Sequence, residues 1–291
     1  MPPSADYHLL DVFTDRAFAG NPLAVFPAAQ KLDSRRMQVI ANELNLSETV
    51  FVGPASDTNR FPIRIFTPTM ELPFAGHPVV GTAHLLAELG LAQRDRPLIL
   101  EAAVGALEVT LEDDLARFTT ARPAEIGAST LDRAKAAALL GLDEGQINGE
   151  PVIASCGLPY HLIELDSLDA LARALPSAAQ WVRHISPSRV EQIYLHVQLD
   201  EEEHLRTRMF STEGGVREDP ATGSAAAALT GYLGSHRTGA GTWDWRIDQG
   251  VEMGRPSRIH ATFERDTHDN PAIHIAGQAV IVGQGRLRAG A

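Results

Sequence analysis

Two segments rich in small residues constrain the fold more than any other feature of the sequence. The first is FAGHPVVGTAHLL at 74–86 and the second is ATGSAAAALTGYL at 221–233, so that Gly76 and Gly223 stand 147 residues apart. A helix with small side chains on every side is typically enclosed by neighbouring backbone. Each segment follows a predicted strand and a proline-containing loop, which favours an internal repeat over two unrelated helices. The 291-residue chain is therefore predicted to have two weakly similar halves, each with strands around one buried helix.

Short apolar segments bounded by Gly, Pro and polar turns predict the other elements. In the first half we expect strands at 7–13, 23–26, 46–52 and 62–67, and two strands within 98–112. We also expect a helix with Asp33 or Ser34 as its N-cap and its end at Asn45. In the second half we expect helices at 131–140 and 167–185, and strands at 161–165, 192–199, 205–210, 257–263 and 272–282. We place the first half at 1–120 and the second at 121–279, with a strand at 280–291 that returns to the first half.

Charge and cysteine content exclude several classes of protein. The chain has 37 acidic and 25 basic residues, a net charge of −12 and no concentrated basic patch, so we expect no nucleic-acid partner. The single cysteine, Cys156, cannot form an internal disulfide. The N-terminal segment MPPSADYHLLDVF lacks the basic region of a signal peptide, and no apolar stretch reaches the ~18–20 residues of a membrane helix. We therefore expect a cytoplasmic protein with no membrane contact.

Motifs for cofactors and metals are missing from the sequence. It has no P-loop, no complete G-x-G-x-x-G after a strand, no G-x-S-x-G and no H-E-x-x-H. One cysteine and no clustered histidine pairs argue against structural zinc. We expect neither a cofactor nor a metal.

The starts of the two small-residue helices are candidate anion-binding points, because the first turn of a helix has free N–H groups and the positive end of the dipole. At the first start, Gly76 allows close approach to the backbone, and His77 precedes Pro78, a residue favoured at the first helical position. Gly223 and Ser224 stand at the equivalent point of the second half. If the halves face each other by pseudo-twofold symmetry, a small carboxylate would bind between the two helix starts.

Glu48 and Asp219 are the carboxylates expected near these points. Glu48 shares a strand face with Val50, and burial there would raise the pKa of this carboxyl from about 4.3 toward neutrality, which suits a proton shuttle. A structural role stays open for each candidate. Glu48 could cap a helix end or pair with Arg64, His77 could be a structural histidine, and Asp219 could be only a helix N-cap.

A series of motifs runs in order through nearly the whole chain. They are DVF at 11–13, GNPLAVF at 20–26, NLSE at 45–48, RIFTP at 64–68, ELPFAGHP at 71–78, RMF at 208–210, EDPATGSA at 218–225 and QGVEMGRPS at 249–257. At these residues the sequence resembles the PhzF-like family, which comprises the phenazine-biosynthesis isomerase and its relatives.

The resemblance implies the fold of diaminopimelate epimerase. This is an α+β fold of two pseudo-symmetric halves, each a curled, mostly antiparallel sheet around a central helix. Epimerases and proline racemases of this fold use two cysteines at the helix starts as acid and base. Here Ala75 and Asp219 stand near those points and the only cysteine is Cys156, so residue content argues against a two-thiol racemase. The resemblance also implies a homodimer.

The resemblance further implies a cofactor-independent isomerase in which Glu48 moves a proton within a dihydro-hydroxyanthranilate ring. His77 and Asp219 match the family's other site residues and would hold the amine and hydroxyl of the substrate. Three residues would bind the substrate carboxylate through N–H and hydroxyl groups: Gly76, Gly223 and Ser224.

Two other functions stay open at this point. One is a small-ligand-binding or partner-binding protein without catalysis, and the other is a racemase that uses Glu48 and Asp219 as opposed bases. Tyr160, in GLPYH at 157–161, departs from the family pattern, which has Arg ahead of the His. It either alters the pocket or packs beneath it, and we favour packing.

Overall fold

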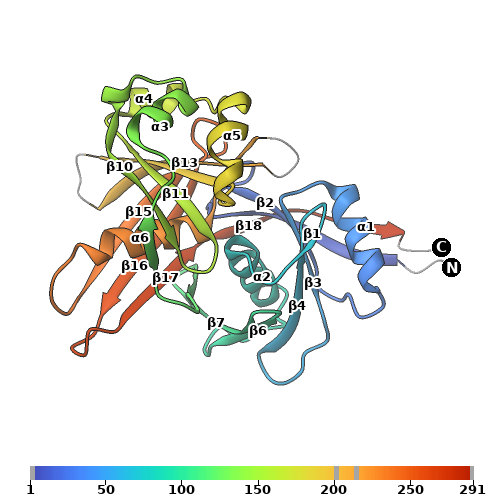
Figure 1. Ribbon diagram of the computed structural model, residues 1–291. Helices are drawn as coiled ribbons and strands as arrows, with labels where there is room; N and C mark the ends of the chain where they lie inside the picture. Colours follow the sequence, from blue (N-terminus) through green and yellow to red (C-terminus); the bar gives the residue numbers. More distant parts are fainter. Residues whose placement is uncertain (1–3, 200–202, 213–215, 289–291) are drawn as a thin grey trace. The chain divides into compact units, whose positions relative to one another are not determined.

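The computed structural model describes residues 4–199, 203–212 and 216–288 (Figure 1). The chain divides into two compact units. The first unit comprises Met1–Thr119 with Ala276–Ala291, and the second comprises Thr120–Ile275. None of the helices in the described ranges is long and apolar enough to span a membrane.

The first unit is built on a mixed sheet. The strands are β1 (Ser4–Val12), β2 (Asn21–Phe26), β3 (Glu48–Val52), β4 (Arg60–Phe66), β5 (Glu71–Leu72), β6 (Leu98–Ala102), β7 (Gly105–Glu112), β8 (Leu115–Thr119) and β18 (Ala279–Arg288). Strand β18 pairs with β1, and the order then continues β2, β3, β4, β6, β7, β8, with β5 added to β4. The β2–β3 and β4–β6 pairs are parallel and the others are antiparallel.

Helix α2 (Gly76–Glu88) lies in the middle of this sheet. It contacts β18 and β1 near one end of the strand order and β7 and β8 at the other, so the sheet curls around it (Figure 1). Every residue from Gly76 to Leu86 is buried. A Cβ atom at Gly81 would come within 2.7 Å of the Leu23 and Val12 side chains, which explains why small residues are needed here. The enclosed helix predicted from the sequence is confirmed.

Helix α1 (Ser34–Leu44) covers the opposite face of the sheet. Asp33, one of the two predicted N-caps, accepts a 2.8 Å hydrogen bond from the Arg36 main-chain N–H. The helix ends at Asn45, as predicted, and Asn45 has the left-handed conformation. Its apolar side packs on the outer residues of the strands. This cluster consists of Ala5, Phe26, Ala29, Leu32, Met37, Ile40, Ala41, Phe51 and Phe66.

The second unit repeats the same strand series. Its strands are β9 (Glu125–Ala128), β10 (Ile147–Ser155), β11 (Pro159–Leu165), β12 (Gln192–Gln198), β13 (His204–Ser211), β14 (Arg217–Asp219), β15 (Gly241–Gln249) and β16 (Ser257–Arg265), and β17 (Pro271–Gly277) crosses the boundary between the units. The order is β9, β10, β11, β12, β13, β15, β16, with β14 added to β13. The parallel pairs are β11–β12 and β13–β15, which correspond to β2–β3 and β4–β6 of the first unit. The two pseudo-symmetric halves are thereby confirmed.

Helix α6 (Gly223–Ser235) is the counterpart of α2. It contacts β10 and β11 on one side and β15 and β16 on the other. A Cβ atom at Gly234 would lie 2.3 Å from the Phe263 ring, so the strands again require a small residue on the helix.

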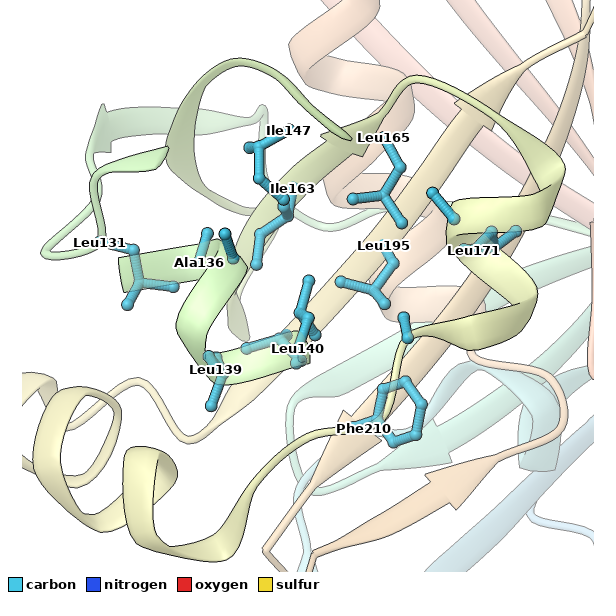
Figure 2. Close-up of a cluster of buried hydrophobic side chains, with 14 of the residues drawn as sticks. Leu131, Ala136, Leu139, Leu140, Ile147, Ile163, Leu165, Leu171, Leu195 and Phe210 are labelled. Atoms are coloured by element: carbon cyan, nitrogen blue, oxygen red, sulfur yellow. The ribbon is translucent and has the colours of Figure 1, made fainter. Parts of the chain in front are cut away.

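Short helices cover the other face of the second sheet. They are α3 (Arg133–Leu140), α4 (Leu168–Arg173) and α5 (Ala178–His184), with 3₁₀ turns at Glu144–Gln146 and Ser186–Ser188. Figure 2 shows leucines of α3 and α4 in one buried cluster with strand residues such as Ile163 and Leu195. The single helix predicted at 167–185 is wrong. The chain leaves α4 at Ala174, and Ser177 caps a separate helix, α5.

The strand predictions also need correction. The segment 272–282 is two strands, because the chain breaks pairing at Gln278, whose carbonyl accepts the Phe13 main-chain N–H. Six strands were not predicted: β5, β8, β9, β10, β14 and β15. In β15, Trp243, Trp245 and Ile247 alternate with polar residues.

Candidate functional site

Glu48 is the first residue of β3 in the first unit. Its register partner on the parallel strand β2 is Leu23, so the two side chains lie on one face of the sheet together with Val50. That face is the one that packs on α2, as the close approach of Leu23 to Gly81 shows. The Glu48 side chain is 17% exposed. A carboxylate is thus placed among apolar strand residues, where it is costly unless it has a partner or a role.

His77 meets Glu48 from the start of α2. Its Nδ1 atom lies 3.4 Å from Glu48 Oε2 and 3.5 Å from the side-chain nitrogen of Asn21, which begins β2. Burial lowers the pKa of His77 to about 3, and a main-chain hydrogen bond at Pro22 opposes this shift only in part. His77 is therefore a neutral imidazole at neutral pH, and its contact with Glu48 is not an ion pair.

Arg64 does not serve as the partner of Glu48. Its guanidinium makes a bidentate contact with Glu71, with Nε–Oε1 and Nη2–Oε2 distances of 2.7 and 2.6 Å. It also donates to the Ser34 hydroxyl, on the side of the sheet that α1 covers. The alternative in which Glu48 pairs with Arg64 is therefore wrong.

The start of α2 has no side-chain cap. Ala75 is the N-cap residue, and the helix begins with Gly76. Pro78 is thus the third helical residue and not the first as predicted. Proline is tolerated there because the main-chain N–H groups of a first turn have no partner within the helix.

Asp219 ends β14 in the second unit. Its Oδ2 atom accepts a 2.5 Å hydrogen bond from the Thr222 hydroxyl, and its main-chain carbonyl accepts one of 2.8 Å from the Gln249 amide. Thr222 is the N-cap residue of α6 and its side chain does not cap the helix. The alternative in which Asp219 is the N-cap is therefore wrong.

Gly223 and Ser224 are the first two residues of α6. The Ser224 hydroxyl lies 2.6 Å from the Tyr160 hydroxyl of β11. Tyr160 is fully buried, and its ring packs against Tyr194 with centroids 6.4 Å apart. The expected packing role of Tyr160 is thus combined with a direct contact to a candidate substrate-binding residue.

Each unit gathers three of the six predicted site residues. In the first unit, Gly76 and His77 begin α2, and His77 contacts Glu48. In the second unit, Asp219 ends β14, and Gly223 and Ser224 begin α6. Sequence reasoning missed Asn21, although it stands in the GNPLAVF motif, and missed Thr222 and Gln249. Within the described ranges, no group of three or more His, Cys, Asp or Glu side chains could hold a metal ion.

Comparison with known proteins places these features in a family. The model of the phenazine biosynthesis-like protein family (PhzC/PhzF) matches residues 10–285. The trans-2,3-dihydro-3-hydroxyanthranilate isomerase of Pseudomonas aeruginosa is 34% identical over 284 residues, which cover 96% of this chain and 98% of that protein. Among solved structures, a PhzF-family phenazine biosynthesis protein of Bacillus anthracis has a TM-score of 0.89 at 24% identity, covering 98% of this chain and 99% of that one. A hydroxyproline epimerase of Agrobacterium vitis has a TM-score of 0.66 at 13% identity, covering 99% and 94%.

The fold is that of the diaminopimelate epimerase-like proteins, since two halves of matching topology each enclose a small-residue helix. Within that class, the chain belongs to the phenazine biosynthesis-like (PhzC/PhzF) family. It is an isomerase, like its named relatives.

Proposed function

We propose that this isomerase moves a proton within a small carboxylate substrate by general acid–base catalysis at Glu48, without a cofactor or metal. The observation that carries the proposal is the contact between Glu48 and His77. A largely buried carboxylate lies 3.4 Å from an imidazole that burial keeps neutral. Such a carboxylate is well suited to accept a proton from a carbon acid held against it.

The substrate we propose is trans-2,3-dihydro-3-hydroxyanthranilate or a close analogue, because relatives about 34% identical are named as isomerases of that compound. Glu48 removes the proton from the ring carbon that bears the hydroxyl, and the electron pair shifts through the ring diene. The carboxylic acid then delivers a proton to another ring carbon. The product is an enol, which becomes the ketone, so the reaction is an isomerisation with no net loss or gain of atoms.

The other candidate residues serve binding and orientation. His77 and Asp219 hold the amine and hydroxyl of the substrate and set the proton affinity of Glu48. The uncapped starts of α2 and α6 offer main-chain N–H groups to the substrate carboxylate. The residues that supply these donors are Gly76, Gly223 and Ser224. We further propose that the protein acts in the cytoplasm as a homodimer.

The test compares Glu48→Gln with the wild-type protein on this substrate. We expect turnover to fall by at least ~10²-fold, because proton transfer by one group typically contributes that much. Substrate binding, measured by calorimetry, should change little. Glu88→Gln is the matched control, since Glu88 ends the same helix as His77 with its side chain 67% exposed.

Three other outcomes would redirect the proposal. Wild-type turnover by Glu48→Gln would exclude Glu48 as the base. Binding without exchange of carbon-bound hydrogen would favour a non-catalytic ligand-binding protein. Loss of optical rotation with a panel of amino acids, abolished in both Glu48→Gln and Asp219→Asn, would favour a racemase with two opposed carboxylates.

A further inference from the structure

The inner side of the second unit carries a buried polar network that its counterpart lacks. Six residues of the second unit are linked by hydrogen bonds or ring contacts, and one of them is Thr222, the N-cap of α6. They are Tyr160, Tyr194, Thr207, Asp219, Thr222 and Gln249. Tyr160, Tyr194, Thr207 and Gln249 are fully buried.

The strand registers identify the equivalent positions in the first unit. Ile65 pairs with Val50 and Leu72, whereas Met209 pairs with Tyr194 and Asp219. Val50 is therefore the counterpart of Tyr194, and Leu72 is the counterpart of Asp219.

The same method assigns the remaining four positions. Val25 pairs with Val50 in the first unit and Leu162 pairs with Tyr194 in the second, so Val25 corresponds to Leu162. In the same way, Phe61 pairs with Leu100 and Leu205 pairs with Ile247, so Phe61 corresponds to Leu205 and Leu100 to Ile247. Counting along these strands, and matching the two helix N-caps, gives apolar counterparts in every case: Leu23 for Tyr160, Ile63 for Thr207, Ala75 for Thr222 and Ala102 for Gln249.

The first unit thus forms the same half-fold around a small-residue helix with apolar residues at all six equivalent positions. Buried polar groups cost free energy unless all are hydrogen-bonded, and apolar replacements are often as stable. The first unit shows that the topology does not need the network. What distinguishes the second unit is Asp219, which stands where the first unit has Leu72.

The hydrogen positions in the network follow from its donors. The main-chain N–H of Thr222 can only donate, and it lies 3.2 Å from Gln249 Oε1, so the amide oxygen of Gln249 faces it. The amide nitrogen must then donate to the Asp219 carbonyl at 2.8 Å and to Thr222 Oγ1 at 3.0 Å. Because Thr222 Oγ1 accepts that bond, its only hydrogen points to Asp219 Oδ2 at 2.5 Å. That length lies in the range of a hydroxyl donating to a carboxylate.

The turn after β15 supports the same segment. Gly250 has a φ of +72°, and a Cβ atom there would lie 2.5 Å from the Pro220 carbonyl oxygen. The Ser257 hydroxyl donates a 2.8 Å hydrogen bond to that same carbonyl. Gln249 and Ser257 therefore hold successive carbonyls of the Asp219–Pro220 segment, but only Gln249 also sets the direction of the Thr222 hydroxyl.

We propose that Gln249 is a positioning residue that, through the Thr222 hydroxyl, fixes Asp219 as an ionised hydrogen-bond acceptor at the start of α6. The proposal deepens the proposed function, since it assumes that Asp219 serves the reaction. It explains why the second unit, which holds Asp219, has polar residues at these positions where the first unit has apolar ones.

The test uses near-isosteric changes in the full-length protein. Gln249→Glu has no amide hydrogen to donate and draws the Thr222 hydroxyl toward itself, whereas Thr222→Val removes the hydroxyl. Thr222→Ser keeps a hydroxyl at this position. Ser257→Ala removes the hydrogen bond to the Pro220 main-chain carbonyl and leaves the Thr222 hydroxyl in place. Carboxyl-¹³C aspartate labelling, with the signal assigned by Asp219→Asn, follows the protonation of Asp219 by NMR without any need for turnover. The value of kcat/KM for trans-2,3-dihydro-3-hydroxyanthranilate is measured in parallel.

We expect the pH at which Asp219 takes up its proton to rise by about one unit in Gln249→Glu and Thr222→Val, and kcat/KM to fall about tenfold. In Thr222→Ser and Ser257→Ala, kcat/KM should stay within about threefold of the wild-type value, and the pH at which Asp219 takes up its proton should not change. An unshifted titration in folded Thr222→Val would overturn the proposal, as would an equal shift in Ser257→Ala. If the NMR shifts occur while Asp219→Asn retains full activity, the network is upheld and the role of Asp219 in the proposed function fails.

Discussion

The protonation state of His77 predicts how the unfolding free energy of the protein depends on pH. The pKa of this imidazole is about 3 in the folded protein and 6.5 when it is freely solvated. The folded-state value lies below the unfolded-state value, so the stability that neutral His77 supports is fully present above pH 6.5. It is lost as pH falls toward 3, because the unfolded chain then takes up a proton that the folded chain cannot.

The size of the effect follows from these two values. Between pH 7.5 and 5.0 the proton binds almost entirely to the unfolded state, and the linkage relation gives a loss of about 2 kcal/mol in unfolding free energy from His77 alone. His77→Asn removes the titrating group and keeps a polar side chain beside Asn21. The fall in unfolding free energy over this pH range should therefore be about 2 kcal/mol smaller in the variant than in the wild type.

Urea unfolding followed by circular dichroism at pH 7.5 and 5.0 measures this difference. His268→Gln is the matched control, because the side chain of His268 is 83% exposed. If His77 were the cation of an ion pair with Glu48, its pKa would be raised and the sign would reverse. A larger fall in His77→Asn than in the wild type would therefore refute the reasoning.

Two further predictions concern the second unit. Gly250→Ala should lower the unfolding free energy by about 2 kcal/mol or more in thermal or urea unfolding, because its Cβ atom would meet the Pro220 carbonyl at 2.5 Å at a φ of +72°. Gly254→Ala, with a φ of +73° and open space around it, should cost only about 1 kcal/mol, and equal effects would argue against the close approach. Tyr160→Phe should raise KM about three- to tenfold with little change in kcat, because Ser224 loses its 2.6 Å hydroxyl partner; an unchanged KM in steady-state kinetics would contradict this.

Local patterns predicted much of the fold. The N-cap at Asp33 and the end at Asn45 follow from short-range signals, and the enclosed helices follow from their small residues. The break between α4 and α5 was missed, because the apolar spacing continues across the point where Ala174 ends α4 and Ser177 caps α5.

The candidate site was predictable only in part. Glu48 and His77 stand out in the sequence, yet the neutral state of His77 depends on burial that no motif reveals. Gln249 could not be assigned a role from the sequence, since its partners Thr222 and Tyr194 lie 27 and 55 residues away along the chain. Its place in the network depends on strand register, which is fixed by the packing of the whole unit.

The most direct test of the central claim is deuterium incorporation, followed by NMR, with trans-2,3-dihydro-3-hydroxyanthranilate and purified protein in D₂O. If Glu48 is the acid and base, the product should carry deuterium on a ring carbon, and Glu48→Gln should show neither conversion nor incorporation. Conversion by Glu48→Gln with wild-type incorporation would contradict the account.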